Sequence, residues 1–144
     1  MTVEDSITTG VAELLHEAGI ATWRLDTAYQ DGEVPVTVAA LPPSDTQAVA
    51  LTVYGSSDDP HYADSVVMLQ AVIRGTTDPR SVDTVAAGIA ELLHGRSGFT
   101  LGGVPVIEAH RQSWSRLGRD ENGRWLRSDN YYLQAHTPTA HRQF

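Results

Sequence analysis

The chain has 144 residues, 41% of them hydrophobic, and a formal net charge of −8 at pH 7. This length suits one compact domain that spans residues 1–144 and buries its own core, and the lack of cysteine excludes disulfides and thiolate metal sites. The acidic charge argues against a general nucleic-acid binder, which needs a basic face for phosphates, and no apolar run is long enough to cross a bilayer, so we expect a soluble protein.

The charge is unevenly distributed along the chain. Residues 1–75 hold eleven acids and two arginines, a net −9, whereas residues 76–144 hold seven acids and eight arginines, a net +1. Because arginine pairs bidentately with carboxylates, we hypothesise that the two halves let copies of the subunit meet head to tail. All ten basic residues are arginine, and a GC-rich genome is the alternative explanation for that usage.

The first third of the chain predicts one helix followed by short strands. Thr2 to Gly19 places apolar residues at helical spacing behind an acidic first turn. Strands are expected at Ile20 to Leu25, Val34 to Leu41 and Ala48 to Tyr54, where apolar residues cluster or alternate. The corner at Pro42-Pro43 predicts that the last two strands pair antiparallel.

The middle of the chain, Ser65 to Gly95, predicts a strand and a helix that form the nucleus of the fold. Val66 to Ile73 is apolar on both alternating faces, as in a central strand covered on both sides. Asp78-Pro79 provides an N-cap and a first-turn proline for the helix that follows. GIAELLH at 88–94 repeats GVAELLH at 10–16, but the flanking sequences differ, which favours two helices covering one sheet over a duplication.

The last third predicts two hairpins. Gly102-Gly103 joins Phe99 to Leu101 with a strand that starts at Val104 and runs on to Trp114. The overall prediction is an α+β fold: a single domain with a mixed, mainly antiparallel sheet and two amphipathic helices on one side.

The second hairpin is expected to protrude as an arm with an arginine-rich tip. Asn122-Gly123 forms its turn, and the return strand is Trp125 to His136. Arginine and tryptophan are enriched at protein interfaces, although a solvated hairpin is the alternative. The candidate interface residues are Trp114, Arg116, Arg119, Arg124, Trp125 and Arg127. Residues 137–144 predict a flexible tail, or one that only a partner orders.

Groups that could carry chemistry are sparse. The six histidines show no metal-binding spacing on a helix, and the chain has neither lysine for a phosphate-binding loop nor a G-x-S-x-G motif. His16 and His94 end the two predicted helices, where a structural role is expected. The acids of Asp58-Asp59-Pro60-His61 lie in a Gly/Ser loop and are expected to be solvated. We therefore expect no catalytic residue, cofactor or metal site.

Four stretches carry a family resemblance: LPPSDTQAVALTVYGSSDDP at 41–60, MLQAVIRGTTDP at 68–79, LGRDENGRW at 117–125 and SDNYYLQAHTPTAHR at 128–142. In order and spacing they resemble the tail terminator proteins of long-tailed bacteriophages, within the group of phage minor capsid or head–tail joining proteins. No single residue is diagnostic of that family, so the resemblance transfers no catalytic or binding residue.

The resemblance implies a structural virion protein with a small α+β fold that assembles as a hexameric ring. Such a ring caps the tail tube, ends its polymerisation and offers a surface to the head's connector proteins. It would be made in the host cytoplasm and reside at the head–tail interface of the virion. The implied partners are other copies of the chain, the tail tube protein and a connector or stopper protein. Genome DNA would pass through the lumen without specific binding, and an acidic lumen would let it slide.

Three other hypotheses remain open at this point. A different head–tail connector, such as a stopper or adaptor, differs from a terminator only in its partner. A small Asp/His-dependent hydrolase would gather Asp58, Asp59, His61 and the C-terminal histidines in one pocket. A ligand-binding module would need a deep apolar pocket.

Overall fold

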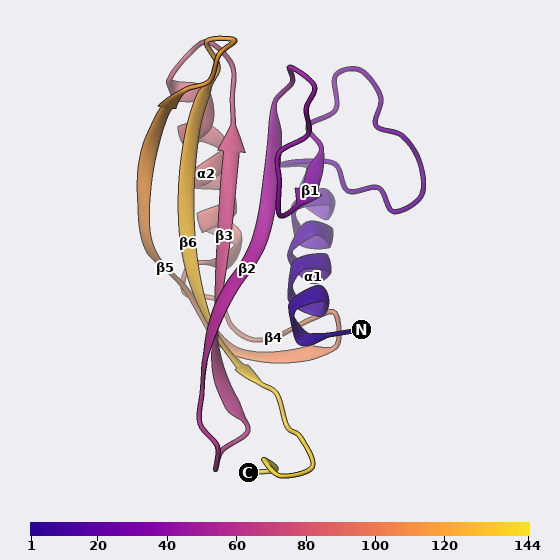
Figure 1. Cartoon of the computed structure of the whole chain (residues 1–144), viewed down its shortest axis with the longest axis vertical. Helices are drawn as coiled ribbons and strands as arrows, with labels where there is room; N and C mark the ends of the chain where they lie inside the picture. Colours follow the sequence, from indigo (N-terminus) through magenta and orange to yellow (C-terminus); the bar gives the residue numbers. More distant parts are fainter.

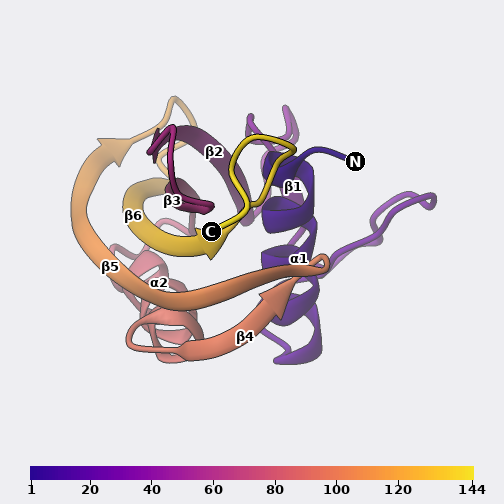
Figure 2. The ribbon, with the colours of Figure 1, turned by 90° about the horizontal axis from the view of Figure 1, so that it is seen from below.

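The computed structural model describes all residues from 1 to 144, and they form two helices and one sheet (Figure 1). The elements are α1 (Val3–Glu17), β1 (Val36–Val38), β2 (Ala48–Asp58), β3 (Asp64–Arg74), α2 (Arg80–Leu93), β4 (Ser97–Leu101), β5 (Val104–Arg119) and β6 (Trp125–His136). The six strands join in the order β1-β2-β3-β6-β5-β4, and the sheet is strongly curled (Figure 2). The predicted single-domain α+β fold with two helices on one side is confirmed.

Helix α1 begins at a capping box in which the Thr2 hydroxyl accepts the Asp5 N–H at 3.1 Å. Its buried stripe consists of Ile7, Val11 and Leu15, and it packs on the β4–β5 turn. The approach is close, since a Cβ added to Gly10 would lie 2.7 Å from the Leu101 Cα.

Helix α2 starts one residue later than predicted, with Pro79 rather than Asp78 at the N-cap position. Asp78 still satisfies the first free donor of the helix, because its Oδ1 accepts the Arg80 N–H at 2.9 Å. The buried residues of α2 are Val82, Ala86, Ile89 and Leu93, whereas Val85 and Leu92 are only partly buried. Gly95 follows with a φ of 83° and turns the chain toward β4.

Strand β3 is central, as predicted, and pairs antiparallel with β2 and β6. The expectation that both of its faces are covered is wrong. Side chains on one face are buried in the 22-residue core cluster, whereas those on the other face, such as Met68 and Gln70, are half-buried. The reason is that both helices lie on the same side of the sheet.

The predicted antiparallel pairing across Pro42-Pro43 is also wrong, because β1 pairs with β2 in parallel, from Val36 opposite Val49 to Val38 opposite Leu51. Residues 39–47 carry the chain back along the sheet before β2 begins. Arg74 holds this return loop: its Nε and Nη2 atoms donate to the carbonyls of Thr46 and Ser44 at 2.6 and 2.5 Å. The strand expected at Ile20 to Leu25 is reduced to a single bridge.

The β4–β5 hairpin turns at Gly102-Gly103 as predicted, with φ values of 55° and 85°. The β5–β6 hairpin, however, does not project as a free arm. Strand β6 pairs with β3 over the whole of β3, from Asp64 opposite His136 to Arg74 opposite Leu126. Its backbone donors and acceptors are therefore used inside the sheet. No helix is both long and apolar enough to span a membrane.

Candidate interaction surfaces

Three of the six predicted interface residues meet between α2 and the helix-facing side of β5 and β6. Arg127 is buried there, and its Nε donates to Asp129 Oδ1 at 2.7 Å while its Nη1 donates to Asp83 Oδ1 at 2.9 Å. Arg116 donates from Nη2 to Asp83 Oδ2 at 2.9 Å. The Arg127 guanidinium lies 3.8 Å from the centroid of the Trp114 ring. We call these five residues, Asp83, Trp114, Arg116, Arg127 and Asp129, the Trp114 platform.

The charged residues of the platform hold the Trp114 indole in place, and the Trp114 side chain remains 44% exposed. Arginine over a tryptophan face is an attractive cation–π contact. Arg116 also lies over the Trp114 ring, at 5.5 Å, and both arginines are held in turn by carboxylates. A rigid, half-exposed tryptophan flanked by arginine is typical of the anchors that dominate protein interfaces.

The charges of the platform balance inside the fold. Asp129 is fully buried and meets both Arg127 and, at 3.4 Å, Arg111. The hydrogen bond from Arg116, assisted by Arg127, lowers the pKa of the Asp83 carboxyl. Burial by itself would lower the pKa of Arg127, but the hydrogen bonds and charges of Asp129 and Asp83 outweigh it and raise that pKa. Burial also raises the pKa of the neighbouring Tyr131 to about 12.

A groove of about 530 Å³ runs beside the platform between α2 and β5. Its lining includes Ala87 and Ala90 of α2, His94 directly after α2 and Arg111 of β5. The sequence did not point to Asp83, which lies 33 and 44 positions from its partners Arg116 and Arg127, or to Asp129. One signal was available: Arg127, Asp129 and Tyr131 alternate along one strand and therefore share a face.

His94 closes the end of this groove, since its Nδ1 accepts the Arg111 N–H at 2.9 Å. His16 does the same at the end of α1, accepting the Trp23 N–H at 3.1 Å. The repeated heptapeptides therefore end in the same arrangement, in which a histidine at the C-terminal end of the helix accepts a hydrogen bond from a backbone N–H of a later segment. This is the structural role expected of both histidines, although it works by a specific hydrogen bond.

The other three predicted interface residues lie at the β5–β6 turn. Arg124 donates to the Gly75 carbonyl at 2.9 Å and pairs with Asp45, and the Trp125 Nε1 donates to the Thr77 carbonyl at 3.2 Å. Arg119 stacks on Trp125, with 5.6 Å between the guanidinium and the ring centroid, and has no carboxylate partner. Only Arg119 of the three is therefore free to meet an acidic group outside the chain.

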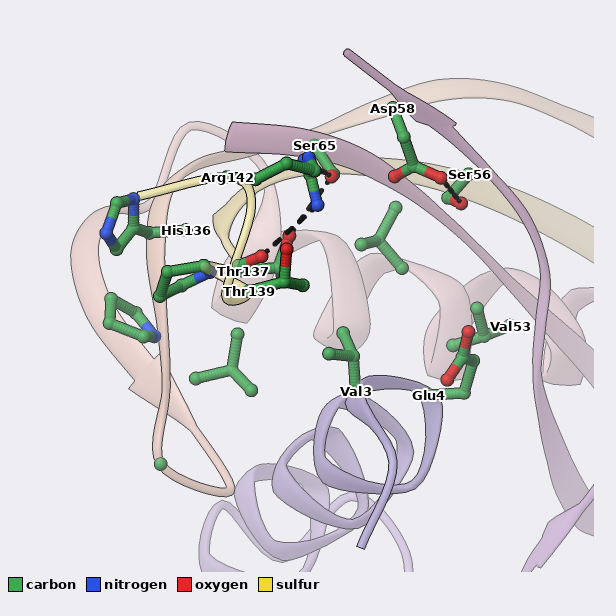
Figure 3. A pocket seen from close by; sticks show the side chains of 15 residues that line it. Val3, Glu4, Val53, Ser56, Asp58, Ser65, His136, Thr137, Thr139 and Arg142 are labelled. Carbon is green, nitrogen blue, oxygen red and sulfur yellow. Dashed lines mark hydrogen bonds between the residues drawn. The ribbon is translucent and has the colours of Figure 1, made fainter. Parts of the chain in front are cut away.

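A second concavity, a cleft of about 640 Å³, opens at the far end of the sheet (Figure 3). It lies between the start of α1, the β2–β3 hairpin, the β4–β5 turn and residues 136–142. The last segment folds back along the hairpin, and Ala63 and Phe144 share a 2.7 Å backbone hydrogen bond. Arg142 fixes it by donating to the Asp59, Tyr62 and Thr137 carbonyls and to the Ser65 hydroxyl.

The cleft does not assemble the cluster that the hydrolase hypothesis required. Asp58 and His136 both line it, but Asp59 and His61 do not. Hydrogen bonds from Ser65 and Ser56 lower the pKa of Asp58, and His136 pairs with Asp64 at 2.8 Å. No group of three or more His, Cys, Asp or Glu side chains is placed to hold a metal ion.

The side of the sheet away from the helices forms a third surface, the open face. Gln70 donates to Ser128 at 3.0 Å, and Asn130 donates to Ser113 at 3.1 Å. The rings of His110 and Tyr132 meet edge to face at 5.8 Å. Half-buried apolar side chains such as Met68 lie among these polar groups, so this face is neither a packed core nor a highly charged surface.

The fold and its surfaces define a small α+β domain whose notable external features are an anchored tryptophan, a cleft and an uncovered sheet face. The sequence model of the family described as "Bacteriophage tail terminator protein" matches residues 14–137. This chain therefore belongs to the bacteriophage tail terminator family, as the resemblance indicated, and is a structural protein of the phage tail and hence of the virion.

No curated protein matches the chain. Among solved structures, one with 14% sequence identity and a TM-score of 0.48 covers 90% of this chain and 92% of its own.

Proposed function

We propose that this chain forms a ring on the end of the phage tail tube, ends tube polymerisation and supplies the surface for head–tail joining. Membership of the tail terminator family, over residues 14–137, is the observation that carries this proposal. The protein would act by binding, not by catalysis, as a homo-oligomer, with six copies as the expected number. Its partners would be the tube protein on one side and a connector or stopper protein on the other.

The asymmetry of the sheet supports a ring. A ring of more than two subunits needs two different surfaces on each subunit that fit each other. The sheet ends in two unlike edges on opposite sides, one formed by β1 and β2 and the other by β4 and β5. The net charge of −8 is also compatible with a channel through which DNA passes without being held.

Tube length provides the test. The purified chain is mixed with polymerising tail tube protein, and tube lengths are measured by electron microscopy while light scattering measures the size of the free protein. A terminator gives short, capped tubes in proportion to the amount added. Tubes of unchanged length, with binding only to the head's connector, would assign the chain to the stopper or adaptor class instead.

A further inference from the structure

Besides the outer edges of the short end strands β1 and β4, two longer stretches of strand in this sheet have an unpaired backbone edge (Figure 1). On one side, β1 pairs with β2 only over Val49 to Leu51, so residues 52–58 of β2 have no partner there. On the other side, β4 pairs with β5 only as far as Glu108. Unpaired N–H and C=O groups on a strand edge are a template for another strand.

The free part of β5 begins after residue 111. Ala109 still exchanges backbone hydrogen bonds with Gly95 and Arg96, and His94 takes the Arg111 N–H. Beyond that point no segment of the chain pairs with the outer edge of β5, and residues 112–117 are all exposed. Residues 56–58 of β2 are exposed too, so both edges are open to a partner of strand form.

We propose that the free edge of β2 in one copy pairs with the free edge of β5 in the next copy, joining subunits head to tail through a continued sheet. The inference rests on the proposed ring and names the surfaces that build it. The partner is a second copy of this chain, because each copy carries both strand edges of the contact, on opposite sides of the same sheet.

The strand directions fit this contact. β2 is antiparallel to β3, β3 to β6 and β6 to β5, so β2 and β5 run in opposite directions. When two copies stand side by side in the same orientation, β2 of one is therefore antiparallel to β5 of the other. The contact is heterologous, as a ring requires.

The two free edges lie at different heights along the sheet. Trp114 of β5 is level with Ala71 of β3, through Asp129, whereas Ser57 of β2 is level with Val66. The step of five residues corresponds to about 17 Å along the strands. The repeat across the strands, from β2 of one copy to β2 of the next through β3, β6 and β5, is four strand spacings, or about 19 Å. A neighbour that pairs edge to edge is thus displaced along the strands.

This displacement closes a ring when the strands tilt relative to the ring axis. A step of about 17 Å for every 19 Å of width is cancelled by a tilt of roughly 40°, within the 35–45° that strands adopt in closed barrels. An untilted arrangement would instead climb with each copy and grow as an open filament.

The side chains on the two edges are also complementary in size. Between the last two of its three irregularities β5 presents Ser113 to Arg116, including the anchored Trp114. After its own irregularity β2 presents Gly55, Ser56 and Ser57. Small side chains opposite a fixed indole leave room for that ring to cover the neighbouring strand, as buried tryptophan anchors do.

Disulfide trapping tests the contact directly, because the chain has no cysteine of its own. Four double variants combine Ser56→Cys or Ser57→Cys with Ser113→Cys or Ser115→Cys. The two β2 positions lie on opposite faces of the sheet, whereas the two β5 positions lie on the open face two residues apart, so the set samples both faces of β2 and two registers of β5. Opposite residues of antiparallel strands have Cα atoms about 4.5–5.5 Å apart, within reach of a disulfide. After oxidation of the assembled protein, at least one pair should give a reducible ladder that extends from dimer to the full ring.

Two controls set the background. Each single variant should give nothing larger than a dimer, because one cysteine cannot link a third copy. The pair Ser57→Cys with Gln134→Cys places the second thiol at an exposed position of β6, which is paired on both sides within the sheet, and it should give no ladder.

The outcomes separate this inference from the proposed function. Suppose that light scattering shows a ring and that the ring caps tubes, but none of the four cysteine pairs gives a ladder. This result would overturn the edge contact and leave the proposed ring function intact. A chain that neither oligomerises nor shortens tubes would remove the proposed function and this inference with it. Cross-links to a cysteine-bearing tube subunit, without links between copies, would assign the edges to the tube and overturn pairing between copies.

Discussion

The guanidinium of Arg127 lies 3.8 Å from the centroid of the Trp114 ring and bonds the fully buried Asp129 two residues along the same strand. One arginine therefore fixes a half-exposed aromatic side chain on the outside and neutralises an acid on the inside. Because Asp129 is fully buried, leaving its carboxylate without this partner would cost folding free energy.

The first prediction concerns this pair. Replacing Arg127 by methionine should lower the free energy of unfolding by about 3–5 kcal/mol, the cost of leaving one member of a buried ion pair without its partner. Urea denaturation followed by tryptophan fluorescence measures it. Arg119→Ala is the matched control: its guanidinium contacts only the Trp125 ring, so stability should change by no more than about 0.5 kcal/mol.

The same control tests an expectation drawn from the sequence. Arg119→Ala should keep the fold and weaken assembly, because this arginine has no carboxylate partner within the chain. Loss of folding in Arg119→Ala would contradict both statements.

The second prediction is a dependence of stability on pH through Asp83. The pKa of this carboxyl is lowered in the folded state, first by the Arg116 hydrogen bond, so its ionised form favours folding. This contribution is fully present above the unfolded pKa of about 3.9 and is lost as the pH falls through the lower folded pKa. Asp83→Asn should be less stable than the wild type at pH 6, and the gap should shrink below about pH 4. A gap that is unchanged by acid would contradict the assignment.

The third prediction compares the two glycines of the repeated heptapeptide. A Cβ on Gly10 would meet the Leu101 backbone at 2.7 Å, whereas one on Gly88 would meet only the flexible end of Ile20 at 3.2 Å. Gly10→Ala should therefore destabilise the protein by about 1–3 kcal/mol through overpacking. Gly88→Ala should be close to neutral, because the better helix propensity of alanine, up to about 1 kcal/mol, offsets a small adjustment. Thermal unfolding of the two variants gives the comparison, and equal losses would exclude this account of the α1 packing.

The fourth prediction concerns the C-terminal segment. Arg142 bonds three carbonyls and one hydroxyl that lie between Asp59 and Thr137. Arg142→Ala should speed hydrogen exchange at the Ala63 amide, which bonds the Phe144 carbonyl, without changing exchange in the centre of β3. Arg96→Ala, whose side chain stacks on Phe99, should leave the Ala63 amide unchanged. Exchange at Ala63 that is already unprotected in the wild type would show that residues 137–144 form the flexible tail expected from the sequence.

Local patterns in the sequence were sufficient to predict most of the helices and hairpins. The apolar periodicity of residues 2–19 and 78–95 predicted both helices, and Gly102-Gly103 and Asn122-Gly123 predicted both late hairpins, because helix periods and turn residues act over a few positions. The family, too, was recognisable from stretches of sequence, and the match over residues 14–137 confirms it.

Pairing and coverage could not be read in this way. The parallel contact of β1 with β2, the single covered face of β3 and the integration of β6 into the sheet all depend on where distant segments lie. An apolar run such as residues 66–73 looks the same whether one or both of its faces are covered.

The same distinction between sequence and tertiary structure holds for the candidate interface residues. The sequence by itself determined that Trp114, Arg116 and Arg127 belong to one hairpin, with Arg116 expected in its tip rather than on β5. Only the tertiary structure decided that Arg127 turns inward to Asp129, that Asp83 of α2 bridges it to Arg116, and that Trp114 is left at the surface beside a free strand edge. The physical reason is that an arginine becomes structural or available according to whether a carboxylate from another segment reaches it, and that distance is set by the packing of α2 on the sheet.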